Sequence, residues 1–469
     1  MRPTTVLHAL LILLAACAAH AQDVHWYTLA VDGVRTGYVH TERNAAADRI
    51  IESETVTLFV RELGRTARVQ RSIVFRHDRA GNALGFDYEL NSGMAREAWR
   101  GTFDHGSLRI HPTAAHAADA ILELPAETAF TPDRSALFEV LWKGQQTSVD
   151  VVAFDPQRRS AGLLRASVVA DDDTGRHVRV AVGAGADVSG EDVWFDAQGN
   201  LVHAEEQSFG ALVNWTPCMH DCDSRVEAPL DFMGRLVVRS PVRIPGWFKH
   251  RTLRYVISRS DGAQPVVAQT FEQAAAFDAS HAVVTICADC GNEAPPSEQT
   301  LAHYLQANAW VRSDAPEIRN LALNTVMRGA GVDFRMRKLV RLVKQRMRGT
   351  NDFLGYADAL TALHSGSGDC TEFAVLLAAF ARAQGIPTRI AAGLAYSDRF
   401  SGKKDVFSPH VWVQAWDGTS WRTYDAALDG FDATHIALAV GDGEPDIVHR
   451  SLAQLPVLRI EKAGVVRDR

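Results

Sequence analysis

The pattern of the chain changes at Glu293-Ala294-Pro295-Pro296-Ser297, and this change limits the folds that are open to it. Before this segment, short runs rich in β-branched and aromatic residues alternate with turn residues, as on either side of Asp32-Gly33. After it come runs rich in Ala, Leu and Arg, which favour helices. Since strands and helices are segregated along the chain, we expect an α+β fold in which β-rich N-terminal modules precede a C-terminal mixed domain.

A chain of 469 residues is too long for one compact core. We predict a signal peptide at 1–21, a β-rich module at 22–125, a second at 126–240, a small β segment or connector at 241–294, and the C-terminal domain at 297–469. The turn pattern D-x-x-G-N occurs at residues 78–82 and again at 196–200. Two related β modules in tandem would explain this repetition, and so would the chance recurrence of a common turn.

The N-terminus predicts export. An apolar stretch follows Arg2, and Ala19-His20-Ala21 supplies the small residues at which a secretory signal is cleaved. Leu14-Ala15-Ala16-Cys17 also resembles a bacterial lipobox, in which Cys17 would be lipidated. We favour cleavage after Ala21 and a periplasmic protein, with a lipoprotein anchored at Cys17 as the alternative. Membrane contact is expected only if Cys17 is lipidated.

Five cysteines remain beyond Cys17, and four of them form close pairs in the sequence: Cys218 with Cys222, and Cys287 with Cys290. An oxidising compartment favours disulfides, although the pairing stays open and a zinc site is the alternative. Cys370 is the odd thiol, which marks it as potentially reactive.

Cys370 follows Gly366-Ser367-Gly368-Asp369, which we interpret as a flexible turn. The next residues, 371–382, are rich in Ala and Leu and predict a helix that Gly385 and Pro387 end. Cys370 would then lie at the helix N-terminus, where the helix dipole favours a thiolate. Further helices are expected from Ser297 as N-cap, at 318–327, and at 334–347, a basic helix that we interpret as a solvated face over an apolar one.

A predicted hairpin supplies the partners of this thiol. We expect a strand at 388–396, a polar loop at 397–405, and then two strands joined at Asp417-Gly418. If Asp417-Gly418 is a two-residue turn, His410 lies directly opposite Asp425 and the two side chains share one face. A four-residue loop would shift the register by two and keep them on that face, whereas a three-residue loop would separate them. A thiol, a histidine and an aspartate are the parts of an activated nucleophile.

These residues carry a family resemblance. Cys370 at a helix start, Gly385-Ile386-Pro387-x-Arg389, His410-x-Trp412 and Trp421-x-x-x-Asp425 together resemble the core of the transglutaminase-like superfamily, which has a papain-type fold. The resemblance implies that Cys370 is the nucleophile, His410 the base and Asp425 the residue that orients it. Gln414 stands where many relatives have Glu, and Ala426 where many have Pro. No calcium site, other metal site or cofactor is implied.

The resulting hypothesis is a thiol enzyme that forms a Cys370 thioester from an amide substrate. The acyl group would pass to water, in a peptidase or amidase, or to an amine, in a transglutaminase. The expected partner is a peptide or protein amide, with cell-wall peptide among the candidates. The net charge of −7 argues against a nucleic-acid partner. The alternative is a catalytically silent scaffold or binding protein of the cell envelope, because fold does not dictate function.

Overall fold

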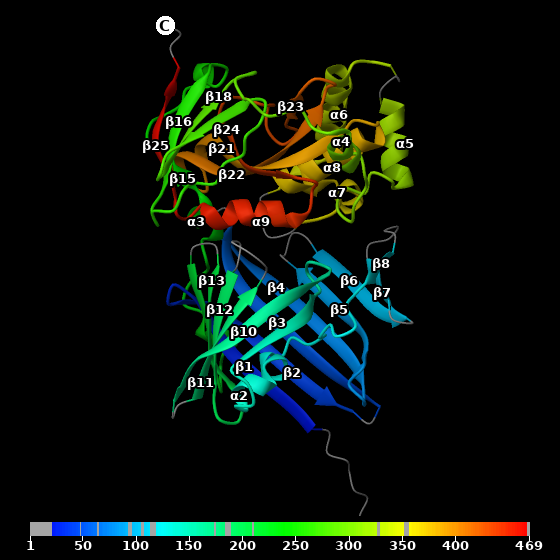
Figure 1. Ribbon diagram of the computed structural model, residues 1–469, viewed down its shortest axis with the longest axis vertical. Helices are drawn as coiled ribbons and strands as arrows, with labels where there is room; N and C mark the ends of the chain where they lie inside the picture. Colours follow the sequence, from blue (N-terminus) through cyan, green and yellow to red (C-terminus); the bar gives the residue numbers. More distant parts are fainter. Residues whose placement is uncertain are drawn as a thin grey trace, which may run out of the picture.

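The computed structural model describes residues 21–46, 48–62, 65–91, 96–104, 107–112, 119–172, 175–182, 189–208, 211–325, 329–350 and 356–466. The predicted signal peptide and the lipobox at Cys17 lie outside these residues, apart from Ala21. The chain forms two lobes, and helix α9 (Pro445–Gln454) lies on the side of the C-terminal lobe that faces the N-terminal one (Figure 1). The fold is α+β, as the segregated sequence pattern predicts.

The N-terminal lobe is built on one antiparallel sheet, which has 14 strands within the described residues. Its strands are β1 (Ala21–Val31), β2 (Val34–Ala45), β3 (Arg49–Glu62), β4 (Arg65–Asp78), β5 (Ala83–Asn91), β6 (Arg96–Asp104), β7 (Ser107–Pro112), β8 (Ala120–Glu123), β9 (Ser148–Asp155), β10 (Ser160–Asp172), β11 (Gly175–Val182), β12 (Ser189–Phe195), β13 (Leu201–Ser208) and β14 (Ala211–Pro217). They run in the order β8 to β1 and then β14 to β9. Because β1 pairs with β14, strands from both predicted β modules belong to the same sheet.

Short turns connect the strands of this sheet. Asp32 and Gly33 join β1 to β2 with positive φ angles of 48° and 79°, which confirms the predicted hairpin. The two D-x-x-G-N turns are also alike. In each, one oxygen of the leading aspartate, Asp78 or Asp196, accepts two backbone N–H groups, and its other oxygen accepts the asparagine side chain. The turns therefore repeat in structure as well as in sequence.

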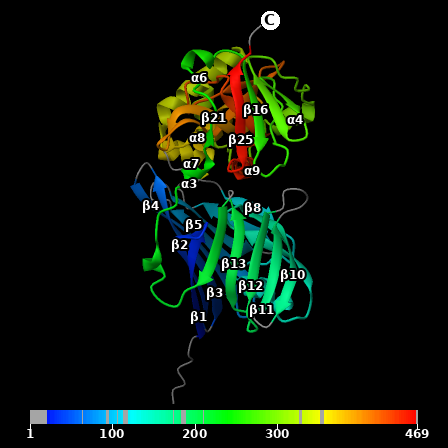
Figure 2. The ribbon, with the colours of Figure 1, turned by 90° about the vertical axis from the view of Figure 1, so that its left-hand side faces the viewer.

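The sheet curls so that distant strands pack together (Figure 2). Phe154 of β9 lies 5.1 Å from Phe86 of β5, ring centroid to ring centroid, although these strands are far apart in the sheet order. Two short helices, α1 (Arg134–Leu137) and α2 (Glu139–Trp142), follow one another, and Phe138 between them and Leu141 of α2 pack on β10–β12. The apolar face of the sheet is buried in this way without a second large layer.

The connector contributes a smaller sheet, ordered β17-β18-β16-β25. Its strands are β16 (Leu253–Arg259), β17 (Gln273–Phe277), β18 (His281–Ile286) and, from the far end of the chain, β25 (Leu458–Val465). The short elements η1 (Asp223–Arg225), α3 (Phe232–Leu236), β15 (Val238–Arg239) and η2 (Gly246–Phe248) lead into it. The sulfur atoms of Cys218 and Cys222, and those of Cys287 and Cys290, lie at disulfide distance.

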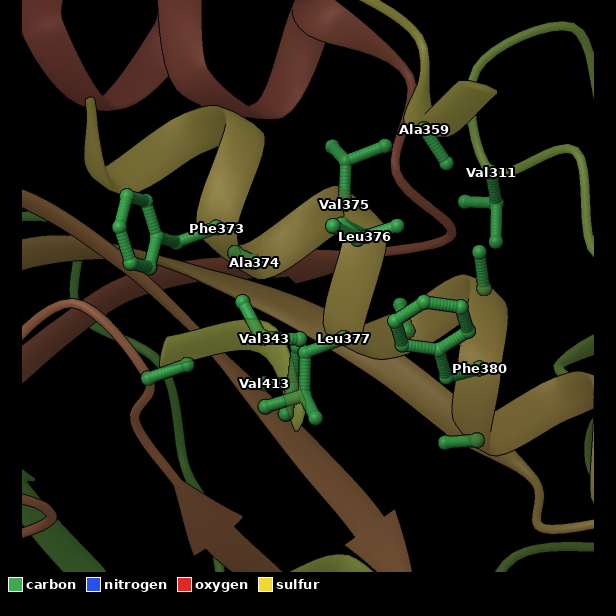
Figure 3. Packing of buried hydrophobic residues seen from close by; sticks show 14 of the residues in the cluster. Val311, Val343, Ala359, Phe373, Ala374, Val375, Leu376, Leu377, Phe380 and Val413 are labelled. Carbon is green, nitrogen blue, oxygen red and sulfur yellow. The ribbon is translucent and has the colours of Figure 1, made fainter. Parts of the chain in front are cut away.

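The C-terminal lobe surrounds one buried helix, α8 (Cys370–Ala383). Its helices and strands are α4 (Glu298–His303), α5 (Pro316–Thr325), α6 (Val332–Arg346), β19 (Arg348–Gly349), α7 (Ala359–Ser365), β20 (Ser367–Gly368), β21 (Thr388–Phe400), β22 (Lys403–Trp416), β23 (Trp421–Tyr424) and β24 (His435–Gly441). Every residue of α8 from Thr371 to Arg382 is buried, so the helix is covered on all sides. Phe373, Leu377 and Phe380 of α8 belong to one buried cluster with Val343 of α6 and Val413 of β22, and Figure 3 shows these side chains around the helix.

Most expected helices of this lobe are present. Ser297 caps α4 by accepting the backbone N–H of Thr300, and the basic helix α6 buries Leu339, Leu342 and Val343, as predicted. In the part of the chain that the structure describes, each helix is too short or too polar to cross a bilayer.

Two local predictions were wrong. The polar segment at residues 397–405 is not a loop, because β21 and β22 continue through it and turn at Ser401 and Gly402. Its residues, polar or Gly apart from Phe400, suit a ribbon that extends beyond the core, where each of them is at least partly exposed. The segment before Cys370 is not a free turn either, since β20 pairs with β19 in parallel. Gly368 is required there because a Cβ would lie 2.5 Å from that of Glu372.

Candidate active site

The hairpin that carries His410 and Asp425 closes with a four-residue loop, not the predicted two-residue turn. Trp416 pairs with Trp421, and Val413 with Tyr424. The loop forms because the Asp417 carboxylate accepts the backbone N–H groups of Thr419 and Ser420. The register shifts by two residues, so His410 and Asp425 stay on one face but are no longer directly opposite.

His410 and Asp425 are in direct contact. His410 Nε2 lies 2.8 Å from Asp425 Oδ2, and the two side chains are only 6% and 1% exposed. The other oxygen of Asp425, Oδ1, accepts the backbone N–H groups of Ala427 and Leu428. Burial alone would raise the pKa of the Asp425 carboxyl, but the charges and hydrogen bonds of His410 and His435 outweigh it and hold that pKa well below its usual range. Asp425 is therefore a fixed carboxylate.

Cys370 begins α8, as predicted, and lies against β22, the strand that carries His410. Its sulfur is placed to accept the backbone N–H of Val411, the residue after His410, and its side chain is partly exposed. His410 makes its hydrogen bond to Asp425 through Nε2, so its other ring nitrogen, Nδ1, is the atom that can accept a proton from another group. The helix start thus brings the thiol to the strand that carries the imidazole.

The electrostatics around Cys370 differ from the prediction. Burial raises the pKa of the Cys370 thiol well above its ordinary value, and the negative charge of Asp369 adds to this effect, while the Val411 N–H opposes it. The helix dipole therefore does not ionise the thiol by itself. In this arrangement Cys370 needs a base to take its proton.

Asp369 and Glu372 form a capping box around Cys370 that the sequence analysis did not identify. Asp369 accepts the backbone N–H and the hydroxyl of Thr371, and Glu372 accepts the backbone N–H groups of Asp369 and Ala357. The signal was present, because Asp followed three residues later by Glu is a variant of the usual helix-start pattern. The box fixes the first turn of α8 and hence the position of the sulfur.

His435 is a second histidine on Asp425 that sequence reasoning missed. Its Nε2 lies 3.1 Å from Asp425 Oδ2, the oxygen that His410 also contacts. His435 begins β24, ten residues after Asp425 and directly before the apolar run Ile436-Ala437-Leu438. A lone histidine beside such a run gives no signal of its own.

Arg389, from the recognised G-I-P-x-R segment, joins the hairpin to the linker. Its guanidinium donates to Gln414 Oε1 at 2.9 and 2.7 Å and to both oxygens of Glu293 at 2.5 and 2.8 Å. Gln414 occupies the position at which many relatives have Glu. Here Glu293, outside the hairpin, supplies the carboxylate that balances Arg389.

His410, Asp425 and His435 also offer three potential metal ligands, and their ligand atoms lie within 4.8 Å of one another. The two separations to Asp425 Oδ2 are those of hydrogen bonds, so protons already satisfy these groups. A divalent ion could bind there only by displacing these protons.

Comparison with known proteins matches one part of the chain to a family. Residues 319–426 match the transglutaminase-like superfamily, and this range includes Cys370, His410 and Asp425. An uncharacterized protein of Mycobacterium leprae is 36% identical over 90 residues, which are 19% of this chain and 32% of that protein. The match therefore spans about a third of that relative.

Two solved structures align over parts of the chain. One is a candidate cysteine protease from Cytophaga hutchinsonii, with 14% identity and a TM-score of 0.29 over 46% of this chain and 86% of that one. The other is the periplasmic domain of TgpA from Pseudomonas aeruginosa, with 17% identity and a TM-score of 0.29 over 51% and 82%. Similarity this low assigns no activity. The family match, together with the helix-start cysteine and the His–Asp hairpin, shows that the chain contains a transglutaminase-like superfamily domain at residues 319–426.

Proposed function

We propose that this protein is a thiol enzyme that forms a Cys370 thioester from an amide substrate. The observation that carries the proposal is the buried His410–Asp425 hydrogen bond, placed one residue from the backbone N–H that contacts Cys370. A general base oriented by a carboxylate and placed beside a thiol is the arrangement that acyl transfer requires. A structural ion pair alone would not need a partly exposed thiol next to it.

The reaction begins when His410 Nδ1 takes the Cys370 proton as the sulfur attacks the carbonyl carbon. The C=O π electrons move to oxygen, and the backbone N–H of Cys370 is a candidate donor to that oxyanion. Collapse of the intermediate breaks the C–N bond, and the leaving amine takes the proton from His410. Asp425 holds the ring and stabilises its imidazolium form throughout.

The thioester is then attacked by water or by a second amine. His410 takes a proton from this nucleophile, the C–S bond breaks, and the proton returns to sulfur. Water yields a peptidase or amidase, and an amine yields a transglutaminase. We expect a peptide or protein amide as the substrate, with cell-wall peptides as the first to test.

The test is incubation with casein or a peptidoglycan stem peptide, with and without a fluorescent primary amine. We compare the wild type, Cys370→Ala, His410→Ala and, as a matched control in the other lobe, His177→Ala. Product without the amine identifies a hydrolase, and amine incorporation identifies a transferase. Both active-site variants should lose the product, and His177→Ala should keep it.

Iodoacetamide labelling tests the site without a substrate. Cys370→Ala should remove the label, and His410→Ala should slow labelling at neutral pH because the sulfur then lacks its base. If labelling of Cys370 is unaffected by His410→Ala and no product forms, the protein is the catalytically silent scaffold or binding protein, and the proposal fails.

We also propose that the protein acts outside the cytoplasm. The support is the apolar segment after Arg2 with its cleavage signal, together with two cysteine pairs at disulfide distance. Sequencing the mature N-terminus from cell fractions tests this. A start at Gln22 means a free periplasmic protein, a lipidated Cys17 means an anchored one, and an intact Met1 in the cytoplasm contradicts export.

A further inference from the structure

The connector places a buried carboxyl group on β23, the strand that leads to Asp425. The backbone N–H of Thr423 in this strand donates to both carboxyl oxygens of Glu272, at distances of 3.2 and 3.1 Å. Glu272 and Thr423 are only 6% and 8% exposed, so this N–H depends on a protein acceptor. Since Asp425 follows Thr423 by two residues, Glu272 helps to fix the end of the strand that carries the Asp425 carboxylate.

The loop that Cys287 and Cys290 close, residues 287–290, lies against the backbone of Glu272; we call it the disulfide loop. The Cys287 backbone N–H donates to the Glu272 carbonyl oxygen at 3.1 Å, and Cys290 Sγ lies 3.9 Å from the same oxygen. Gly291, directly after the loop, donates its N–H to the Phe271 carbonyl oxygen at 2.9 Å. The disulfide loop therefore fixes the chain at Glu272 and at the residue before it.

The same region also contacts the strands on either side of the candidate carboxylate. Arg422 of β23 donates from Nη1 to the carbonyl oxygen of Ala288 in the disulfide loop at 2.9 Å, and its guanidinium lies 4.4 Å from the centroid of the Phe271 ring. The side-chain amide of Gln273 binds both the N–H and the carbonyl oxygen of Ala437 in β24, at 2.9 and 2.8 Å. Residues 271–273 thus connect the disulfide loop to β23 and to β24.

We propose that the disulfide loop holds Glu272, a positioning residue, against β23, and that acyl transfer by Cys370 therefore depends on the Cys287–Cys290 bond. The inference rests on the proposed acyl transfer and deepens it, because it names a condition under which the site works. Formation of the bond joins the two sulfur atoms and passes two electrons and two protons to an oxidising disulfide, which becomes a dithiol. The site would gain activity after this oxidation, while Cys370 stays a thiol.

The size of the effect follows from the geometry of the base. Without the bond, residues 287–290 gain conformational freedom, and the contacts of Glu272 and Arg422 with β23 loosen. His410 then loses part of its orientation, because Asp425 is displaced with the end of β23. Misplacement by about 1 Å can lower a rate by about 100-fold. The loss should appear in kcat rather than KM, since this pair moves protons and does not need to hold the substrate.

The second cysteine pair provides a matched control. Cys218 donates its backbone N–H to the carbonyl oxygen of Trp26 in β1, so the Cys218–Cys222 pair belongs to the N-terminal lobe. Removing that pair also deletes one disulfide from the chain, but it leaves the contacts of Glu272 unchanged. A difference between the two deletions therefore reports the position of the bond rather than the loss of a disulfide as such.

The first experiment measures kcat and KM in variants that keep Cys370. Cys287→Ser with Cys290→Ser, and separately Glu272→Ala, should lower kcat by about 10- to 100-fold with KM within about twofold. Glu272→Gln keeps an acceptor oxygen for Thr423 and should recover kcat to within about threefold of the wild type. Cys218→Ser with Cys222→Ser should retain the wild-type kcat. Wild-type kcat in a folded Cys287→Ser/Cys290→Ser or Glu272→Ala variant would overturn the proposal.

Hydrogen exchange tests the same contact without turnover. In the Cys218→Ser/Cys222→Ser variant, a dithiol reductant can act on the Cys287–Cys290 bond without also opening the other pair. We expect reduction to speed exchange in peptides from β23 and residues 425–428 by more than about tenfold, and to leave peptides from β11 and β12 unchanged. Equal exchange before and after reduction would refute the inference. If exchange responds but the wild type forms no product, the support of β23 by the loop stands and the acyl-transfer proposal alone fails.

Discussion

The two lobes each contain a histidine–aspartate pair beside a tryptophan, and only one of them forms a candidate site. In the N-terminal sheet, His177 Nε2 lies 2.6 Å from Asp192 Oδ1, and the His177 ring stacks on Trp194. In the C-terminal lobe, His410 lies 2.8 Å from Asp425 and stacks on Trp412. The pairwise geometry is nearly the same, so it cannot be what distinguishes them.

The surroundings of the two aspartates differ. Asp192 is shared with Arg179, at 3.0 Å, and its side chain is 27% exposed. Asp425 is shared with a second histidine and is 1% exposed. Water screens the charge of the Asp192 carboxylate. The charge of the Asp425 carboxylate acts at short range in a medium of low dielectric constant, close to the helix start that carries the thiol. Burial and the neighbouring sulfur, rather than the pair itself, make a nucleophilic site.

The largest effect that separates the two pairs should come from Asp→Asn substitutions. Asp425→Asn should lower kcat/KM by about 10³–10⁴-fold, because an amide cannot stabilise the imidazolium and can favour the wrong tautomer of His410. Asp192→Asn should stay within about twofold, since a surface substitution far from the site leaves the chemistry alone. The measurement is the rate of product formation with the casein or stem-peptide substrate described above.

A loss of activity in Asp192→Asn similar to that in Asp425→Asn would break the comparison. It would mean that the N-terminal sheet takes part in the reaction, for example by binding the substrate. Thermal unfolding of both variants is the control, because a variant that no longer folds would lose activity for a trivial reason.

The second effect concerns stability and pH. The pKa of folded His435 is raised from 6.5 to about 9. A group whose pKa is higher in the folded state than in the unfolded state stabilises the fold. This stabilisation is fully present at pH values below the pKa of the unfolded state, and it is lost as the pH rises through the pKa of the folded state. A shift of this size corresponds to roughly 3 kcal/mol, lost between about pH 6.5 and 9. Hydrogen exchange of peptides from β22 and β24, corrected for the intrinsic exchange rate, should show this loss.

Peptides from β11 and β12, which carry His177 and Asp192, provide the internal control. Their opening free energy should change little over the same pH range, because solvent screens that pair. His435→Gln should flatten the dependence in β22 and β24. A wild-type C-terminal lobe that is equally stable at pH 6.5 and 9 would contradict the raised pKa of His435.

Much of this fold could be predicted from local sequence. Asp32-Gly33 and the two D-x-x-G-N turns form the expected turns because their own side chains and φ angles determine them. The helix from Cys370 was predictable because an Ala- and Leu-rich run needs no distant partner to be recognised. The pairing of β1 with β14, and of β16 with β25, was not predictable, since strand order depends on contacts between residues about 200 positions apart.

In the candidate site, too, some residues could be predicted from local sequence and others depend on distant contacts. Cys370, His410 and Asp425 could be selected because a motif and a period-two pattern place them, and the four-residue loop left the shared face intact. The ionisation state of Cys370 could not be predicted, because it depends first on the burial of the thiol in the folded protein and then on the charge of Asp369 beside it. His435 could not be selected because its role exists only once β24 lies beside β21 and brings it to Asp425.

The smallest effect should come from His177→Gln. The His177 and Asp192 side chains are 17% and 27% exposed, a contact that solvent reaches contributes about 0–1 kcal/mol, and Arg179 remains to balance Asp192 after the substitution. We therefore expect the free energy of unfolding to fall by less than about 1 kcal/mol, and by less still in 1 M salt, which screens such pairs. Urea denaturation at both salt concentrations measures it. A loss of about 3 kcal/mol that does not depend on salt would show that the His177–Asp192 pair is as tightly coupled as the His410–Asp425 pair. Burial would then no longer explain why only one of the two pairs lies in a candidate site.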